Sequence, residues 1–158
     1  MAKTLILYFS SHGNTEKIVK EIQAQLREPC DLAPIKGFKV SKLAEYDRIA
    51  LGGSIHAGRM QKQVKAFAEK NTSVLATKPL ALFVGCLDKE KPVEYIEATF
   101  PPELVAHATL KTGVGGDVVI ENLPGFMRMI MKKITPTEDM RHSPNAEGRE
   151  ALKKFLEG

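Results

Sequence analysis

A segment rich in hydroxyl and amide side chains, Ser10-Ser11-His12-Gly13-Asn14-Thr15, follows the first apolar run and leads directly into a helical pattern. Such a segment can hold a phosphate group, because N–H groups at a helix N-terminus and Ser or Thr hydroxyls donate hydrogen bonds to phosphate oxygens. It is neither a Walker loop nor a G-x-G-x-x-G fingerprint. The same residue types are common helix caps. Phosphate binding and simple helix capping are therefore two open interpretations.

Two further segments also follow apolar runs. Residues 52–58 (Gly-Gly-Ser-Ile-His-Ala-Gly) come after the run 48–53, and residues 85–88 (Gly-Cys-Leu-Asp) come at the end of the run 79–86. In open parallel sheets, ligands bind beyond the carboxyl ends of the strands. The three segments are therefore the candidate binding-site segments.

His56 is the candidate catalytic residue, because the pKa of an imidazole lies near working pH and permits acid–base chemistry. A solvated surface histidine is the alternative. His12 could pair with a phosphate as a cation, or could occupy an exposed turn. Cys86 ends a buried run, which favours a small core residue over a nucleophile. Neither a protein nucleophile nor a metal site is predicted.

The runs that must position these segments alternate with helical patterns. Strands are predicted over residues 4–9, about 32–35, 48–53, 79–86 and 108–113. Helices are predicted after Thr15, around residues 64–68, from Pro92, and over residues 144–156 with Ser143 as N-cap. Continuously apolar strands are typical of a parallel sheet covered on both faces. The sequence therefore predicts a doubly wound α/β sandwich.

Length and composition restrict the class of protein. The chain has 158 residues, a one-domain length, and its longest apolar stretch, residues 79–87, is too short to span a bilayer. The first residues contain no signal sequence, so a cytosolic protein with reduced Cys30 and Cys86 is expected. The net charge of +4 favours anionic partners or surfaces. No basic run is interleaved with aromatic residues, so nucleic-acid binding is not predicted.

The pattern Ser10-x-x-Gly13-x-Thr15 after an N-terminal strand resembles the phosphate loop of the flavodoxins. Residues 52–58 and 85–88 stand where flavodoxin-like proteins place the two walls of the isoalloxazine pocket. The resemblance implies a single flavodoxin-like domain over residues 1–158: a three-layer α/β/α sandwich with a five-stranded parallel sheet of order 2-1-3-4-5. It implies FMN as cofactor, with these binding residues: Ser10, Ser11, His12, Gly13, Asn14, Thr15, Ser54, Ile55, His56, Ala57, Gly58, Gly85, Cys86, Leu87 and Asp88.

One branch of this group is more similar than the others. The stretch Gly53-Ser54-Ile55-x-x-Gly58, and residues 127–133 (Met-Arg-Met-Ile-Met-Lys-Lys), look like the menaquinone-dependent protoporphyrinogen IX dehydrogenases. That resemblance implies an oxidoreductase that passes electrons through FMN to a quinone-type acceptor or a redox partner protein. A soluble flavodoxin-type electron carrier is the alternative. Ordinary flavodoxins are acidic and stack a Trp on the flavin, whereas this chain is basic and has no Trp.

Residues 123–134 form a one-sided helical stripe of apolar side chains. The stripe consists of Leu123, Phe126, Met127, Ile130, Met131 and Ile134, and the opposite face carries Arg128, Lys132 and Lys133. One interpretation is a helix that docks on its own sheet. The other is a face for a quinone, a partner or the inner surface of the membrane, because methionines with flanking lysines suit a lipid surface.

Overall fold

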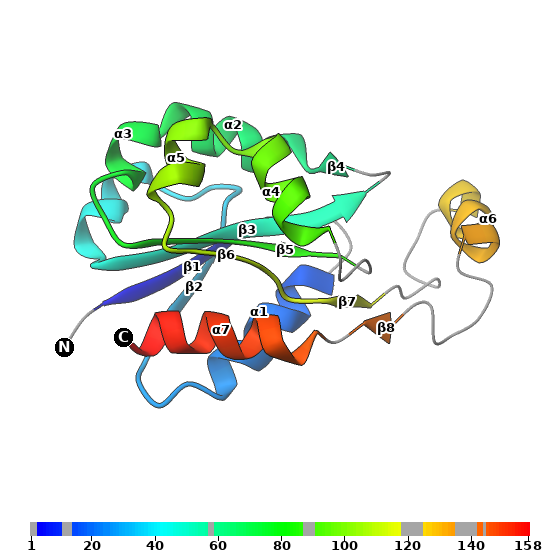
Figure 1. Ribbon diagram of the computed structural model, residues 1–158, viewed down its shortest axis with the longest axis horizontal. Helices are drawn as coiled ribbons and strands as arrows, with labels where there is room; N and C mark the ends of the chain where they lie inside the picture. Colours follow the sequence, from blue (N-terminus) through cyan, green and yellow to red (C-terminus); the bar gives the residue numbers. More distant parts are fainter. Residues whose placement is uncertain are drawn as a thin grey trace.

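A central parallel sheet lies between two layers of helices in the computed structural model (Figure 1). The structure describes residues 3–10, 14–56, 59–86, 91–117, 125–134, 142–143 and 145–158. Within these ranges it describes only the backbone of Asn14, His56, Asp117, Met127, Met131, Lys132, Ile134, His142 and Ser143.

Five strands form the parallel sheet, in the spatial order β2-β1-β3-β5-β6. They are β1 (Thr4–Tyr8), β2 (Asp31–Pro34), β3 (Arg48–His56), β5 (Leu80–Gly85) and β6 (Leu110–Gly113). A further short strand, β4 (Arg59–Met60), pairs antiparallel with the end of β3 and is not part of the parallel sheet. When the five parallel strands alone are numbered along the chain, β5 becomes the fourth strand and β6 the fifth, and the observed order is 2-1-3-4-5. The predicted flavodoxin-like topology is therefore confirmed.

The helices cover both faces of the sheet (Figure 1). One layer holds α2 (Lys62–Lys70), α3 (Thr72–Leu75), α4 (Pro92–Thr99), α5 (Pro102–His107) and the 3₁₀ helix η1 (Val40–Glu45); the other holds α1 (Asn14–Ala24) and α7 (Ala146–Glu157). Alternate residues of β1 serve the two layers, with Leu5 and Leu7 in the first core and Ile6 and Tyr8 in the second. Burial on both faces explains why the strands are continuously apolar.

A second, two-stranded sheet lies between the last strand of the parallel sheet and the last helix in chain order. Strands β7 (Gly116–Asp117) and β8 (His142–Ser143) pair antiparallel. The prediction that Ser143 caps the last helix is wrong, because its backbone belongs to β8. The N-cap of α7 is Asn145, which has left-handed backbone angles (φ 39°, ψ 67°) and accepts a hydrogen bond from the Gly148 N–H. Asparagine tolerates this conformation better than most residues.

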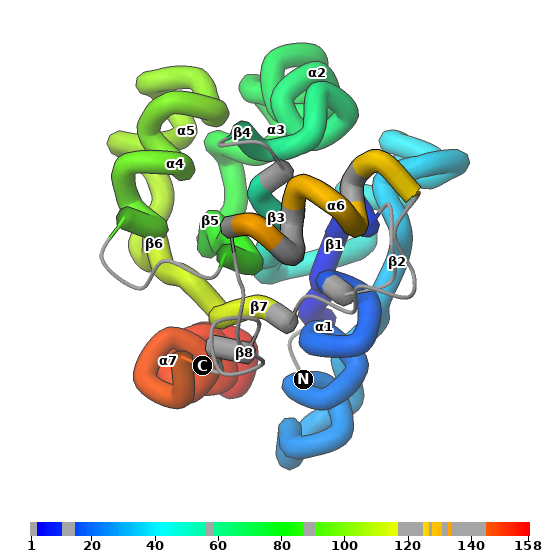
Figure 2. The backbone as a smooth tube through the Cα atoms, turned by 90° about the vertical axis from the view of Figure 1, so that its right-hand side faces the viewer, coloured from blue at the N-terminus to red at the C-terminus, as the bar shows by residue number. Residues whose placement is uncertain are grey.

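Helix α6 (Gly125–Ile134) lies apart from both helix layers, beyond the edge of the sheet where the strands end (Figure 1). Figure 2 views the molecule from that side and shows α6 in front of the strands. Three of its large apolar side chains are mostly solvent-exposed: Phe126 at 68%, Met129 at 63% and Ile130 at 51%. The sheet therefore does not cover these side chains. Among the described residues, no helix is long and apolar enough to cross a membrane.

Candidate functional site

Two buried hydroxyl groups lie between the end of β1 and the start of α1. Ser10 follows β1, and Thr15 is in the first turn of α1, where its side chain is only 1% exposed. Within the described part of the chain, neither Ser10 Oγ nor Thr15 Oγ1 has a hydrogen-bond partner. A buried polar group left unpaired costs about 1–3 kcal/mol. Among the described residues, these two buried hydroxyls at the start of α1 are therefore without an acceptor or donor.

The other predicted residues of this segment are only partly visible. Asn14 begins α1, but the structure describes only its backbone, and Ser11, His12 and Gly13 lie outside the described residues. The start of α1 also has an acidic residue in its first turn, Glu16, whose carboxylate pairs with Lys20 at 2.7 Å. The N-terminus of a helix carries a partial positive charge, and Thr15 lies in this first turn.

The ends of three elements converge beside these hydroxyls. A Cβ atom placed on Gly85, the last residue of β5, would lie 3.7 Å from Thr15 Oγ1 and 3.7 Å from the Cβ of Ser54. The same atom would lie 3.2 Å from the backbone oxygen of Gly115, which follows β6. The structure thus brings together described residues of all three predicted segments, which lie far apart in the sequence.

The second segment differs from the predicted turn. Residues 52–58 were expected to leave the sheet after Gly53, but β3 continues to His56 and pairs with β4 through Ile55 with Met60 and His56 with Arg59. The strand can continue because the short hairpin satisfies its backbone groups. Only the backbone of His56 is described, and Ala57 and Gly58 lie outside the described residues.

Gln61 fixes the position of Ser54, a role that sequence analysis missed. The Ser54 N–H donates to Gln61 Oε1 at 2.9 Å, and Gln61 Nε2 donates to Ser54 Oγ at 2.8 Å. A Cβ atom on Gly53 would lie only 2.6 Å from Gln61 Oε1, so the glycine allows this approach. The available signal was the glycine pair at the end of an apolar run, because glycine inside a strand often marks a close approach of other groups.

The third segment is visible up to Cys86. Cys86 is a buried thiol directly after β5 that forms no disulfide with a described residue, and a Cβ atom on Gly116 would lie 3.4–3.6 Å from its backbone atoms. Leu87 and Asp88 lie outside the described residues.

Tyr8, the last residue of β1, has a phenol whose pKa is raised above its ordinary value. Burial is the larger cause, and the negative charge of the Glu16 carboxylate is the second. Tyr8 therefore stays neutral at physiological pH.

Comparison of the sequence with models of known protein families gives one match that agrees with this geometry. The family model described as "Flavodoxin domain" matches residues 5–145. The chain belongs to the flavodoxin domain family. FMN is accordingly its cofactor, and the residues fit that group, because Ser10 Oγ and Thr15 Oγ1 are unpaired donors of the kind that a phosphate accepts from.

Similar proteins include named oxidoreductases. Protoporphyrinogen IX dehydrogenase (quinone) of Escherichia coli K12 is 29% identical over 93 residues, covering 57% of this chain and 51% of that protein. NAD(P)H dehydrogenase (quinone) of Caulobacter vibrioides NA1000 is 34% identical over 90 residues, covering 42% and 45%. The chain thus matches about half the length of these curated relatives.

A solved structure extends the similarity of fold over nearly the whole chain. Oxidised flavodoxin 2 from Bacillus cereus superimposes with a TM-score of 0.60 at 22% identity, covering 98% of this chain and 97% of that one. At this identity the match concerns the fold, which agrees with the sheet order described above.

Proposed function

We propose that this chain is an FMN-dependent oxidoreductase that delivers electrons to a quinone-type acceptor. The observation that carries the proposal is the pair of buried, unpaired hydroxyls, Ser10 Oγ and Thr15 Oγ1, at the N-terminus of α1. The quinone acceptor is supported by the names of the two matched relatives, both of which specify a quinone. FMN supplies the exchange of electrons when it is bound.

The residues of the chain would bind and orient the cofactor. Ser10 and Thr15 would donate hydrogen bonds to the phosphate, together with Ser11, Gly13 and Asn14 of the same segment. The isoalloxazine walls would come from residues 54–58 and 85–88. Gln61 would hold the first wall in place through its two hydrogen bonds to Ser54, and the missing side chain of Gly85 would leave room between the walls. His56 is the candidate for proton transfer.

The purified chain, loaded with FMN and desalted, is expected to retain a flavin absorbance spectrum. After anaerobic reduction, mixing with menadione is expected to restore the oxidised spectrum, with the quinone taking two electrons and two protons to become a quinol. Stopped-flow absorbance measures the rate. A colourless protein after desalting would contradict FMN binding. Retained flavin that menadione does not reoxidise would contradict only the quinone assignment.

A soluble electron carrier is the second candidate, because the sheet superimposes on a flavodoxin over nearly its whole length. A reductive titration distinguishes the two. A single two-electron transition supports the oxidoreductase, whereas two well-separated one-electron transitions support the carrier.

We further propose that α6 contacts the cytoplasmic surface of the membrane, where a lipid-soluble quinone resides. Its exposed Phe126, Met129 and Ile130 are apolar, and the nearby Arg128 and Lys133 are exposed cations. The expectation that Lys133 lies opposite to the apolar stripe is corrected by the helix period, because Lys133 comes seven residues after Phe126 and so lies on the same side of α6. Apolar insertion with flanking basic residues is the typical form of an interfacial helix.

The variant F126S/M129S/I130S is expected to lose sedimentation with phosphatidylglycerol vesicles that the wild-type chain shows. The matched control is V40S/V93S, because Val40 (42% exposed) and Val93 (39% exposed) are also exposed large apolar residues but lie outside α6. The control is expected to sediment like the wild type. Equal sedimentation of all three proteins, or none for the wild type, would contradict membrane contact through α6.

A further inference from the structure

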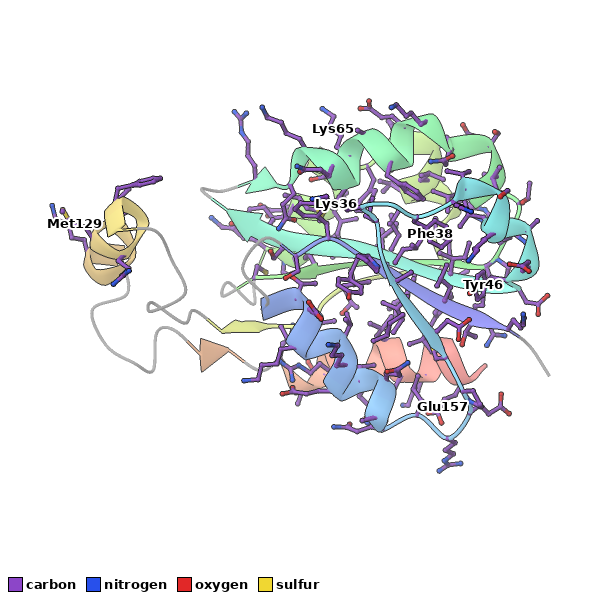
Figure 3. The ribbon with its side chains drawn as sticks, turned by 180° about the vertical axis from the view of Figure 1, so that it is seen from behind. Lys36, Phe38, Tyr46, Lys65, Met129 and Glu157 are labelled. Atoms are coloured by element: carbon purple, nitrogen blue, oxygen red, sulfur yellow. The ribbon has the colours of Figure 1, made fainter. Side chains whose placement is uncertain are left out.

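A groove of about 470 Å³ runs along the outer side of β2, the edge strand of the sheet. One wall is β2 itself, and the other is formed by the chain from Lys36 to Tyr46, including η1. Figure 3 shows Lys36, Phe38 and Tyr46 around this region, on the body of the sandwich and away from α6. The groove is therefore separate from the apolar face of α6.

The groove is lined by positive charge. Lys36, Lys39 and Lys42 all line it and are all exposed, and within the described residues none of the three forms an ion pair. Three lysines thus outnumber the carboxylates of the described lining.

Asp31 is the one carboxylate among the described residues that line the groove. Asp31 Oδ2 accepts a hydrogen bond of 2.6 Å from the Tyr46 hydroxyl. This hydrogen bond is the main cause that raises the pKa of Tyr46 to about 12. Tyr46 therefore keeps its proton at neutral pH and continues to donate to Asp31. The Tyr46 hydroxyl is a neutral donor, so this hydrogen bond orders the Asp31 side chain and leaves three lysines against one carboxylate in the described lining.

Packing beneath the groove holds its outer wall in place. The Phe38 ring packs edge-on against Phe67 of α2, with ring centroids 6.4 Å apart. The Tyr46 backbone oxygen accepts a hydrogen bond of 2.6 Å from Lys78 Nζ, and the Lys42 N–H donates to the Lys39 backbone oxygen at 3.0 Å. A preformed site loses little conformational entropy when a ligand binds.

We infer that this groove docks an acidic segment of a partner protein through Lys36, Lys39 and Lys42. Complementary charge steers such encounters and suppresses wrong partners. The inference does not depend on the function proposed above, because the groove shares no residue with the candidate flavin site.

The shape of the groove favours a protein over other anionic partners. A concave site suits a protruding peptide, whereas a membrane surface is met by convex or insertable elements such as α6. Nucleic-acid recognition would use exposed aromatic rings for stacking, but the Phe38 ring is packed on Phe67 and the half-buried Tyr46 is hydrogen-bonded to Asp31. Pro34 ends β2 and has no N–H, which disfavours simple addition of a strand from a second copy.

The test is fluorescence anisotropy with a labelled peptide rich in Glu and Asp, at low ionic strength. The wild-type chain is expected to bind it with an affinity that falls as salt is added. The variant K36Q/K39Q/K42Q is expected to bind about tenfold more weakly, which corresponds to about 1.4 kcal/mol. The matched control K70Q/K91Q/K154Q removes the same charge from exposed lysines outside the groove and is expected to bind within about twofold of wild type.

Equal losses in the two triple variants would overturn the inference, because they would reflect net charge alone. Two further probes separate the other anionic partners. A single-stranded oligonucleotide that binds more tightly than the peptide, and only through the groove lysines, would assign the groove to nucleic acid instead. Phosphatidylglycerol vesicles that sediment the wild type but not K36Q/K39Q/K42Q would assign it to a lipid surface. All three proteins should share one thermal unfolding midpoint, since the substituted side chains are exposed.

Discussion

The variant T15V is expected to bind FMN about 10–100-fold more weakly than the wild type while its apoprotein becomes no less stable. Thr15 Oγ1 is buried and, within the described residues, has no hydrogen-bond partner. A hydrogen bond to a charged group contributes about 1.5–3 kcal/mol, which sets the expected loss of affinity. Valine has nearly the same shape and removes an unpaired buried oxygen, so the free energy of unfolding of the apoprotein should rise by up to about 1 kcal/mol.

Thr99 provides the matched control for this prediction. It is also a buried threonine in a helix, but its Oγ1 donates to the Tyr95 backbone oxygen at 2.8 Å. T99V is therefore expected to lower stability slightly and to leave FMN affinity unchanged, the reverse of T15V. Quenching of FMN fluorescence measures the affinity, and urea unfolding of the apoprotein measures the stability. If T15V binds FMN like the wild type, Ser10 to Thr15 is a helix start and not a phosphate site.

The order and type of the main elements could be predicted from the sequence because the strands are buried on both faces. β1 and β5 are buried at every residue, so they stand out as uninterrupted apolar runs of strand length. The placement of the candidate site followed from the same fact, since parallel strands end at a common edge. Thr15, Ser54 and Gly85 meet at that edge, as their order after three predicted strands required.

Contacts that depend on tertiary geometry were not predictable from local pattern. The extension of β3 to His56 arises from its pairing with only two residues, Arg59 and Met60, which is too short to give a periodic signal. Gln61 looks like an ordinary polar residue at a helix start, and only the hairpin brings its amide to Ser54. The cap of α7 was misplaced by two residues because serine and asparagine are about equally good N-caps, and only the pairing of β7 with β8 places Ser143 in a strand.

The apolar stripe of residues 123–134 shows a different limit. Its periodicity correctly predicted the helix α6, but periodicity gives the direction of an apolar face and not what covers it. In the structure Phe126, Met129 and Ile130 face solvent rather than the sheet. An exposed apolar group of this kind on an otherwise ordinary surface is typical of an interaction site. Exposure of these three side chains could not be predicted from the periodicity, and membrane contact through them is the proposal that the vesicle experiment tests.

The variant G148A is expected to lower the free energy of unfolding by about 3 kcal/mol, although alanine is normally the better helix former by about 1 kcal/mol. A Cβ atom on Gly148, in the first turn of α7, would overlap the Gly113 backbone oxygen and lie 3.0 Å from Thr112 Oγ1. The clash is with backbone, so no side-chain rotation can relieve it. Helix α7 would have to move away from β6.

That movement would break the contacts that tie α7 to the end of β6. Asn145 Nδ2 donates to the Gly113 oxygen at 3.0 Å, and Arg149 Nε donates to the Val114 oxygen at 2.8 Å. Arg149 also pairs with Glu21 of α1 at 3.0 Å, so the shift would loosen the helix that carries Thr15.

Gly125 gives the matched control, because a Cβ atom there would have no neighbour within 4 Å. G125A is expected to keep the wild-type stability within about 0.5 kcal/mol. Urea unfolding followed by circular dichroism measures both variants, with FMN titration as a second readout. The loosened α1 predicts that G148A also weakens FMN binding, whereas G125A does not. An unfolding midpoint for G148A equal to that of G125A would mean that α7 does not approach β6 this closely. The expected loss of FMN binding through movement of Arg149 and α1 would then have no structural reason.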